Sequence, residues 1–560
     1  MRPAIPGRHW APKGSKTFMS EPESEDGAAP WWRGAVIYQI YPRSFMDSNG
    51  DGIGDLAGIT AKLDYVASLG VDAIWFSPFF ASPMRDFGYD VSDYRAIDPI
   101  FGTLEDFDRL VARAHALNLR VIIDQVYAHT SDIHTWFTQS RADRTNDRQD
   151  WYVWADPKPD GTPPNNWLAV FFGPSWTWDG RRGQYYLHNF LPSQPNLNVH
   201  NPAVQDALFD TARFWLQRGV DGFRLDAINF AMHDRSLTDN PAVDQPGAVF
   251  KRPFDFQHHL HNQSQPELVP FIEKLAAVMV EFGADRFTVA EVGGEHALDE
   301  MKLYTNGRKR LNTSYSFDFL YAEQLSPSLV LDTLSKWPGT DGEGWPSWAF
   351  SNHDAPRAVT RWGGPQGGAD LAKLLLTLLM SLRGNVFLYQ GEELGLTQAA
   401  IPFERLRDPE AIANWPLTLG RDGARTPMPW TEDAPHAGFS STEPWLPIPP
   451  DHVAKAVAEQ DGEADSVLEI TRELIALRRS SPVLRLGRFE PLNLPAPLLG
   501  FDRVTAQGRL RCLFNLGPDT KDCALLAPGQ LLFAAGPVDP GNKTLGGLAG
   551  CILEVPAAGQ

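Results

Sequence analysis

Three carboxylate residues in this chain are placed where nucleophilic and acid–base chemistry is expected. Asp226, Glu291 and Asp354 each lie at or just after the end of a short apolar run. Arg224 stands two residues before Asp226, so both side chains would share one face of a strand. The guanidinium would then keep the carboxylate ionised and lower its pKa. An ionised nucleophile beside a carboxylic acid is what cleavage of a glycosidic bond needs, so the pattern predicts a sugar hydrolase.

The composition is that of an acidic globular protein. The 560 residues are 43% hydrophobic and 21% charged, and this length allows a large core and several domains. The formal net charge of −19 disfavours nucleic acid and anionic membranes and suits a neutral substrate. The three cysteines, an odd number near the C-terminus, argue against a disulfide framework and for a reducing compartment. We expect a cytoplasmic protein.

The first part of the chain differs from the rest. Residues 1–30 mix Pro, Gly, Ser and charges, without the apolar stretch of a secretory signal peptide. We expect them to form a disordered extension. No apolar segment elsewhere is long enough to span a bilayer, so no membrane partner is expected.

Short apolar runs alternate with amphipathic stretches from about Trp31 onward. Eight strands separated by helical patterns predict an α/β fold with a parallel sheet, closed at this length into a (β/α)8 TIM barrel. The three acids fall at the ends of the fourth, fifth and seventh runs, where such barrels place their chemistry. The expected strands are 35–41, 71–77, 119–126, 222–228, 287–292, 314–320, 348–351 and 385–389. The helical patterns include 59–69, 104–117, 202–218, 268–282 and 371–383.

Two long interruptions and a C-terminal segment complete the predicted architecture. Residues 130–198, after the third strand, are too long for a loop, so we expect an inserted subdomain. Residues 392–450 would form an excursion after the eighth strand. The barrel would comprise 31–129 and 199–475, and short strand-like runs in 476–560 predict a C-terminal all-β domain.

Six segments match one family in sequence order. They are Tyr38–Phe45 with the Asp-rich loop after it, Gly88–Asp90, Asp124–His129, Gly222–Asn229, Glu291 and Asn352–Asp354. Together they resemble the α-amylase family (glycoside hydrolase family 13), in particular its α-glucosidase and oligo-1,6-glucosidase branch, from about Trp31 to the C-terminal domain. The resemblance implies Asp226 as nucleophile, Glu291 as general acid/base and Asp354 as stabiliser of the transition state.

The same resemblance implies further sugar-binding residues. His129 and His353 are similar to the two histidines that hydrogen-bond the glucose next to the nucleophile, and Tyr89 looks like the aromatic platform beneath that ring. Asp86 and Arg425 resemble the pair that grips the non-reducing end and closes the site into a pocket, which implies release of one glucose at a time. The full predicted substrate-binding set is Asp86, Tyr89, His129, Arg224, Ala227, His353 and Arg425.

The loop after the first strand alternates oxygen-bearing side chains with glycines. Asp47, Asn49, Asp51 and Asp55 occupy alternate positions, and the Ile53 carbonyl would complete the ring around one hard cation. The loop resembles the first part of an EF-hand loop, and members of the resembled family carry Ca²⁺ or Mg²⁺ here. An ordinary cluster of Asp, Asn and Gly turns is the alternative. We expect one structural Ca²⁺ (or Mg²⁺) site, away from the acids.

Two features bear on the linkage that is cleaved, and they disagree. In the resembled branch, the residue after the nucleophile tends to be Val in enzymes that attack α-1,6 bonds and Ala or Thr in those that prefer α-1,4 bonds. Here it is Ala227. The segment Gln194–Asn198 instead resembles the Gln-Pro-Asp-Leu-Asn of the oligo-1,6 branch, with Asn196 in place of Asp. Ala227 adjoins the reacting carbon and has a steric rationale, so we expect a preference for α-1,4 bonds.

The predicted function is a retaining, exo-acting α-glucosidase that acts on short α-1,4-linked gluco-oligosaccharides such as maltose and transfers α-glucosyl groups to acceptor hydroxyls. Its partners would be small oligosaccharides and hydroxyl compounds. Sucrose hydrolase or isomerase, oligo-1,6-glucosidase and trehalose synthase stay open as alternatives. A glucosidase-like transporter ectodomain, which is not an enzyme, would need a membrane anchor and would tolerate loss of the acids. The oligomeric state is not predicted.

Overall fold

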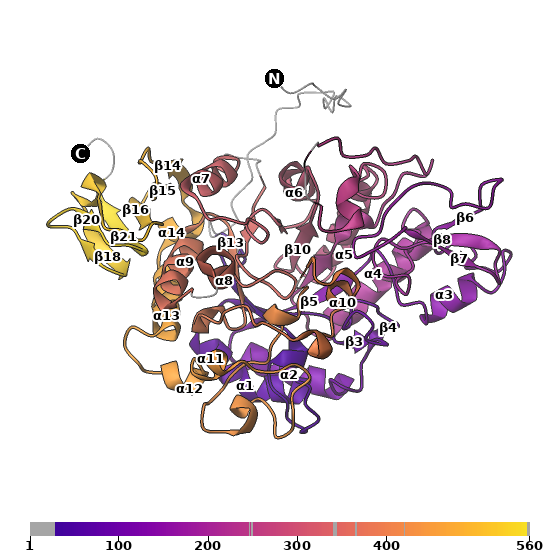
Figure 1. The fold of residues 1–560 in the computed structure, drawn as a ribbon, viewed down its shortest axis with the longest axis horizontal. Helices are drawn as coiled ribbons and strands as arrows, with labels where there is room; N and C mark the ends of the chain where they lie inside the picture. The colour runs from indigo at the N-terminus through magenta and orange to yellow at the C-terminus, as the bar shows by residue number, and fades with distance from the viewer. Residues whose placement is uncertain are drawn as a thin grey trace.

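The computed structural model of the chain describes residues 29–245, 247, 250–307, 309–339, 344–364, 367–418 and 420–556. The predicted disordered extension, residues 1–30, lies outside the described residues except for its last two. A central barrel carries a subdomain on one side and a β domain on the opposite side (Figure 1).

Eight parallel strands form the central sheet, so the predicted (β/α)8 barrel is confirmed. In the order in which they pair, they are β11 (Thr313–Ser316), β10 (Phe287–Val292), β9 (Gly222–Asp226), β5 (Arg120–Val126), β2 (Ala73–Phe76), β1 (Val36–Ile40), β13 (Asn385–Tyr389) and β12 (Ser347–Trp348). A parallel bridge between Ser314 and Pro346 joins the two ends of this order, so the sheet closes on itself. Every residue of β1, β2, β9, β10 and β13 is buried, which explains why these runs are largely apolar on both faces rather than alternating.

Helices follow the strands and cover the outside of the barrel. The five helical patterns expected from the sequence all form helices. Helix α2 shows why: Thr103 and Asp106 form a capping box at its start, and its buried residues recur three or four positions apart on one face. The helices are α1 (Leu56–Ser68), α2 (Leu104–Ala116), α4 (Pro202–Gln217), α5 (Leu268–Val280), α6 (Ala297–Thr305), α7 (Pro327–Ser335), α8 (Ala358–Gly363), α9 (Ala369–Ser381) and α13 (Val467–Ser480).

The two predicted interruptions have different structures. Residues 130–198 contain α3 (Thr135–Ser140) and an antiparallel sheet of β6 (Trp154–Ala155), β8 (Gln184–Leu187) and β7 (Trp176–Asp179), with a small core that includes Trp167 and Trp176. The described part of 392–450 contains short helices, among them α10 (Pro409–Asn414) and the single turn η7 (Asp422–Ala424). Asn414 donates a hydrogen bond to the Phe171 carbonyl, which ties this excursion to the inserted subdomain.

The C-terminal part is all-β, as predicted. A five-stranded antiparallel sheet runs in the order β14 (Arg488–Pro491), β15 (Leu498–Thr505), β16 (Gly508–Asn515), β21 (Ala549–Val555) and β18 (Gln530–Ala535). Helix α13 runs across position 476, and the first strand begins at Arg488. The residue limits proposed for the domains therefore stay a prediction.

Two further observations concern the chain as a whole. Among the helices that the structure describes, none combines the length and the apolar character needed to cross a bilayer. Cys512, Cys523 and Cys551 are all buried and free.

Candidate active site

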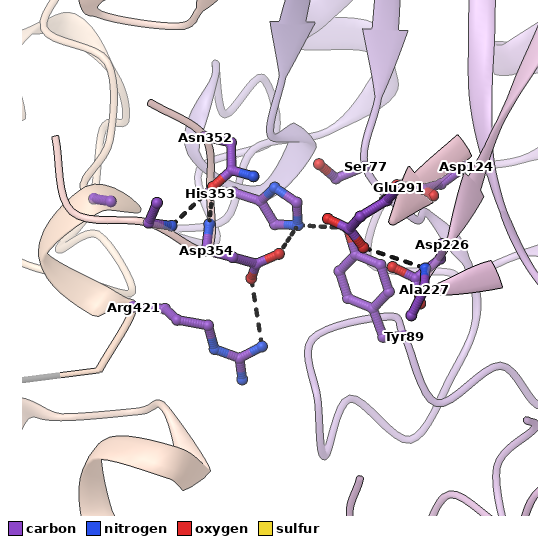
Figure 2. Close-up of polar contacts among 12 residues, drawn as sticks. Ser77, Tyr89, Asp124, Asp226, Ala227, Glu291, Asn352, His353, Asp354 and Arg421 are labelled. Atoms are coloured by element: carbon purple, nitrogen blue, oxygen red, sulfur yellow. Dashed lines mark hydrogen bonds and ion pairs between the residues drawn. The ribbon is translucent and has the colours of Figure 1, made fainter. Parts of the chain in front are cut away.

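The three predicted acids come together at one end of the barrel (Figure 2). Asp226 is the last residue of β9, Glu291 is the penultimate residue of β10, and Asp354 lies in the loop after β12. Parallel strands end at the same edge of a sheet, which is why residues far apart in sequence meet here. Asp226 and Glu291 are only 7% and 5% exposed, so their charges are largely removed from water.

The buried side chain of Arg224 joins the acids. Its Nη1 donates to Oδ1 of Asp226 at 2.5 Å and to Oδ1 of Asp124 at 2.8 Å. Its Nη2 lies 2.6 Å from Oε1 of Glu291. Residues 224 and 226 point to the same face of β9, as their spacing predicts. One guanidinium therefore contacts three carboxyl groups.

Burial changes the protonation of these carboxyls. It raises the pKa of Asp226 well above its usual range, against the lowering by Arg224, and Glu291 and Asp124 raise it further. The predicted lowering of this pKa is wrong, because desolvation and two neighbouring carboxyls outweigh one guanidinium. Burial also raises the pKa of Asp124 to about 7. The pKa of Glu291 is raised by burial, against Arg224, and by the charge of Asp354. The cluster therefore favours keeping a proton near neutral pH.

Asp354 has the opposite surroundings. Its Oδ1 accepts from Nη2 of Arg425 at 2.7 Å and lies 3.5 Å from Nη1 of Arg421, and its Oδ2 lies 3.1 Å from Nε2 of His353. Burial raises its pKa, but His353 and the two arginines outweigh that effect and hold the pKa below its usual range. Neighbouring carboxyls whose pKa values are pushed apart are suited to different roles, which agrees with the roles predicted for Glu291 as acid and Asp354 as anion.

His353 has a defined tautomer. Nε2 of Gln39 lies 2.7 Å from its Nδ1, and an amide nitrogen only donates, so Nδ1 accepts. Burial lowers the pKa of His353 to about 3, so the ring is neutral and its one proton is on Nε2. That nitrogen faces the hydroxyl of Tyr89 at 2.5 Å and the carboxylate of Asp354. The Tyr89 ring also stacks on the imidazole, with 5.5 Å between centroids and 12° between planes.

His129 is buried at the same end of the barrel. Its Nε2 lies 3.1 Å from the Tyr89 carbonyl and 3.2 Å from Nε2 of Gln194, and its Nδ1 is buried without a partner in the part of the chain that the structure describes. Nε2 of Gln194 also donates to Oδ2 of Asp86 at 3.0 Å. The structure thus brings the predicted sugar-binding residues into one contact network, while their roles toward a sugar stay predictions.

The arginine that pairs with Asp86 is Arg421. Its Nη2 lies 2.7 Å from Oδ1 of Asp86 and 2.8 Å from Oδ1 of Asp408. Arg425 instead directs Nη2 to Asp354 and donates from Nε to the His353 carbonyl at 2.7 Å. The predicted Asp86–Arg425 pair is therefore wrong. The two arginines flank the single turn η7, so one reaches Asp86 and the other points to Asp354, a difference that their spacing along the chain does not reveal.

Ala227 contributes through its backbone. It adopts a left-handed conformation, with φ 37° and ψ 43°, directly after β9. This turn aims its N–H at Oε2 of Glu291, at 3.2 Å (Figure 2). A small side chain keeps the cost of a positive φ low at this position.

The loop predicted to hold a metal is folded by its own side chains. Oδ1 atoms of Asp47, Asn49 and Asp51 each accept from the backbone N–H two residues ahead, and Asp55 caps α1 by accepting from Gly58. These turns curl a loop whose donor set consists of oxygen atoms only, as Ca²⁺ and Mg²⁺ require. Within the described ranges, no group of three or more His, Cys, Asp or Glu side chains is placed to share an ion. The mixed set, with the Asn49 amide and the Ile53 carbonyl, stays a prediction.

Among the residues that contact the acids or Arg224, the sequence did not predict Asp124, Tyr315 or Arg421 as site residues. Asp124 pairs in register with Arg224, and Tyr315 pairs in register with Glu291. A predicted order of barrel strands would place both near the acids, since residues in register on neighbouring strands lie side by side. No comparable signal separates Arg421 from Arg425.

Comparison with known proteins agrees with this geometry. Residues 39–487 match the family described as alpha amylase, catalytic domain. A probable α-glucosidase from Rhizobium meliloti (strain 1021) is 54% identical over 496 residues, which cover 87% of this chain and 90% of the relative. An oligo-1,6-glucosidase from Heyndrickxia coagulans is 38% identical over 525 residues, covering 88% of this chain and 93% of the relative.

Solved structures are similar over nearly the whole chain. The crystal structure of an α-glucosyl transfer enzyme, XgtA, matches with a TM-score of 0.90 at 52% identity, covering 94% of this chain and 100% of that one. The trehalulose synthase MutB from Pseudomonas mesoacidophila MX-45 matches with a TM-score of 0.85 at 33% identity, with the same coverage.

Proposed function

This chain belongs to the α-amylase family of glycoside hydrolases, and from that membership we propose a retaining, exo-acting α-glucosidase that releases α-glucose from the non-reducing end of short α-1,4-linked gluco-oligosaccharides such as maltose. The observation that carries the proposal is the contact of Arg224 with both Asp226 and Glu291, opposite an Asp354 held ionised by His353 and two arginines. Two carboxyls that contact one guanidinium lie near each other, and a direct double displacement needs such neighbouring carboxyls.

In the first step, Glu291 gives its proton to the glycosidic oxygen while Asp226 attacks the anomeric carbon. The bond between that carbon and the leaving oxygen breaks, and a β-linked glucosyl ester forms on Asp226. Arg224 holds Oδ1 of Asp226, which leaves Oδ2 for the attack. Asp354, kept ionised, stabilises the positive charge that develops on the sugar ring.

In the second step, Glu291 is ionised and takes a proton from a hydroxyl compound that attacks the anomeric carbon from the face opposite Asp226. The bond between that carbon and the Asp226 oxygen breaks, and Asp226 is released as a carboxylate. Water gives α-glucose, and an alcohol or a sugar gives a new α-glucoside. The anomeric configuration is retained because the carbon is inverted twice. Transfer therefore needs only an acceptor that competes with water. The α-glucosyl transfer activity named for XgtA supports this part of the proposal.

Release of one glucose at a time would follow from a site that is closed at the non-reducing end of the substrate. Arg421 links Asp86 to Asp408 beside Asp354, and the three side chains Asp86, Asp408 and Arg421 are each at most 7% exposed. A buried ion cluster at this place would bar a longer chain from extending beyond one glucose. We assign to Asp86 and Arg421 the grip on the non-reducing end that the sequence suggested for Asp86 and Arg425.

A second candidate activity is the hydrolysis or isomerisation of sucrose. It is favoured by the likeness to MutB, a trehalulose synthase by its printed name, at 33% identity. The relatives named oligo-1,6-glucosidase, together with the Gln194–Asn198 segment, favour α-1,6 bonds instead. Ala227 beside the nucleophile supports α-1,4 bonds, and we retain that preference.

Two further features belong to the proposal. The Asp47–Asp55 loop would hold one structural Ca²⁺ or Mg²⁺ through Asp47, Asn49, Asp51, Asp55 and the Ile53 carbonyl, on the grounds of its all-oxygen donor set. A reducing compartment, the cytoplasm, suits three cysteines that are buried and free.

The proposal is tested by a time course on maltose, isomaltose, sucrose and trehalose, with products resolved by anomer in proton NMR. We expect maltose to be cleaved fastest, with α-glucose as the first-formed anomer and transfer products at high maltose concentration. Initial release of β-glucose would exclude the retaining mechanism. Faster turnover of sucrose with isomeric disaccharide products would replace the proposed function by the second candidate.

A further inference from the structure

Tyr315 contacts the predicted acid/base carboxyl directly. It lies on β11, in register with Glu291 of β10, and is 1% exposed. Its hydroxyl lies 3.0 Å from Oε1 of Glu291. The same hydroxyl lies 3.1 Å from Nε and 3.0 Å from Nη2 of Arg224. Tyr315 therefore touches both the acid/base residue and the guanidinium that holds the nucleophile.

The chemistry of the three groups fixes the direction of these hydrogen bonds. A guanidinium only donates, so the phenol oxygen accepts from Arg224. Burial raises the pKa of Tyr315 well above its usual range, against the lowering by Arg224, so the phenol keeps its proton. That single proton is left for Oε1 of Glu291. Oε1 thus receives two donors, the Tyr315 hydroxyl and Nη2 of Arg224 at 2.6 Å.

We propose that Tyr315 is a positioning residue that, together with Arg224, keeps Oε1 of Glu291 as an acceptor and assigns the transferable proton to Oε2. Among the described residues, Oε2 accepts one hydrogen bond, from the Ala227 N–H at 3.2 Å. Ala227 directly follows Asp226, so Oε2 lies beside the backbone that carries the proposed nucleophile. The inference rests on the proposed glucosidase function.

This arrangement gives Tyr315 a part in both steps of the reaction. In the first step Oε2 releases its proton to the leaving oxygen, and the carboxylate that results is stabilised by the hydrogen bond that Tyr315 already makes to Oε1. In the second step the proton of the attacking hydroxyl returns to Oε2, and Oε1 stays an acceptor throughout. A donor aimed at the charged form of a carboxyl lowers its pKa and lowers the barrier to forming that charge.

The test is the pH dependence of kcat/KM for maltose in Tyr315→Phe, which removes the hydroxyl and keeps the ring. Without that donor the ionised form of Glu291 is less stable, so its pKa rises. The alkaline limb of the profile reports deprotonation of Glu291, and it should shift to higher pH by about half to one unit. We expect kcat to fall about tenfold with KM nearly unchanged, because the lost bond strengthens only as charge develops.

Tyr38→Phe is the matched control. Tyr38 is fully buried on β1 and donates to Oε1 of Glu393 at 2.6 Å, so the same hydroxyl is deleted from a buried Tyr–Glu pair that does not contact the acids. If Tyr315 had only a structural role, both variants would have a lower Tm, and both pH profiles would coincide with that of the wild type. That result would overturn the inference.

A second variant keeps the inference testable if Tyr315→Phe does not fold. Site-specific 3-fluorotyrosine at position 315 keeps the hydroxyl and makes it a stronger donor, so the alkaline limb should move down instead of up. An unmoved limb would contradict the inference even where the enzyme is active. If the wild type cleaves no α-glucoside at any pH, the proposed function fails, and the pH comparison does not arise.

Discussion

At the scale of single residues, the protonation of the site depends on how many cationic side chains contact each carboxyl. Arg224 is shared by Asp124, Asp226 and Glu291, whereas Asp354 has Arg421 and Arg425 near it. The first group therefore holds a proton that the second does not. Desolvation acts on all four carboxyls, so their neighbours separate their pKa values. Asp354 has His353 and two guanidinium groups beside it, whereas the other three share one guanidinium and are repelled by neighbouring carboxyls.

Replacing Asp226, the proposed nucleophile, tests its role directly. Asp226→Asn should lower kcat on maltose by several orders of magnitude, because an amide cannot form the glucosyl ester. Asp221→Asn is the control from the other end of β9. Asp221 accepts from the Val121 N–H at 2.8 Å and pairs with Arg286, at the end of the barrel opposite the three acids. This change should therefore lower Tm while kcat per folded enzyme stays near that of the wild type. Wild-type-like turnover by folded Asp226→Asn would refute the assignment.

Glu291→Gln should separate substrates by their leaving groups. Maltose needs a proton on its departing sugar, so glycosylation of Asp226 should slow severely. An activated aryl glucoside leaves without that proton, so its glycosylation step should suffer much less. Burst kinetics isolates this step from the hydrolysis of the ester. Equal losses for both substrates in the burst phase would count against Glu291 as the acid.

Ala227 is the residue to change for linkage preference. In Ala227→Val, kcat/KM should shift from maltose toward isomaltose by roughly tenfold to a hundredfold, the scale of discrimination by one or two methyl groups. The left-handed backbone at this position makes a β-branched residue costly, so a lower Tm is also expected. Ala227→Gly keeps the space open without that strain and should retain the preference for maltose. A wild type that already favours isomaltose would contradict the proposed linkage.

At the scale of elements, apolar runs predict which strands exist better than where they end. The run 314–320 was expected as one strand, but β11 stops at Ser316, and the run 348–351 contains only the end of β12. After β12 the chain turns, and the Asn352 side chain accepts from the N–H groups of Asp354 and Ala355 at 2.9 and 2.8 Å. Hydrophobicity records burial, and residues such as Phe319, Leu320, Ala349 and Phe350 are buried although they lie beyond the strand ends. The pattern therefore does not show the turn that positions Asp354.

The candidate site was predictable where the chain positions a residue locally. The Arg224–Asp226 pair follows from strand alternation, and the three acids follow from strand ends. The Asp86–Arg421 pair and the contact of Tyr315 with Glu291 depend on how distant segments meet. Strand register and the path of a long excursion are tertiary properties, and a single sequence does not contain them in readable form.

The Asp47–Asp55 loop carries a prediction at this scale. One divalent cation should be found by elemental analysis, and its removal by a chelator should lower Tm, because an ion bound only to the native state stabilises it by mass action. Asp51→Ala should lower the affinity of the loop for the ion and reproduce the loss of Tm, with kcat unchanged at saturating ion concentration. Asp160→Ala removes a comparable exposed turn residue elsewhere and should have little effect. Absence of metal in the purified native enzyme would contradict the proposed cation site.

At the scale of the whole molecule, Arg503 connects the C-terminal sheet to the barrel, and Arg478 connects α13 to it; within the part of the chain that the structure describes, neither forms a salt bridge with an acidic side chain. Arg503 of β15 donates to the Ser381 carbonyl, at the end of α9, at 2.7 Å and to the Gly487 carbonyl at 2.8 Å. Arg478 of α13 donates to the carbonyls of Gly34, Met380, Leu382 and Gly384. These carbonyls are the unpaired ends of elements, and the guanidinium groups satisfy them where water does not reach.

The connection is tested with Arg503→Met, which keeps an apolar stem of similar length and removes the donors. The carbonyls of Ser381 and Gly487 would lose these bonds at a fully buried position, at a cost of about 1–3 kcal/mol for each group left unpaired. Tm measured by calorimetry should therefore fall clearly, while kcat and KM on maltose stay those of the wild type, because the acids lie in the barrel. Arg488→Met is the control: Arg488 is 63% exposed on β14 and pairs only loosely with Glu490, so its loss should hardly change Tm. If the two variants melt at the same temperature, the carbonyl contacts of Arg503 do not hold the C-terminal sheet on the barrel.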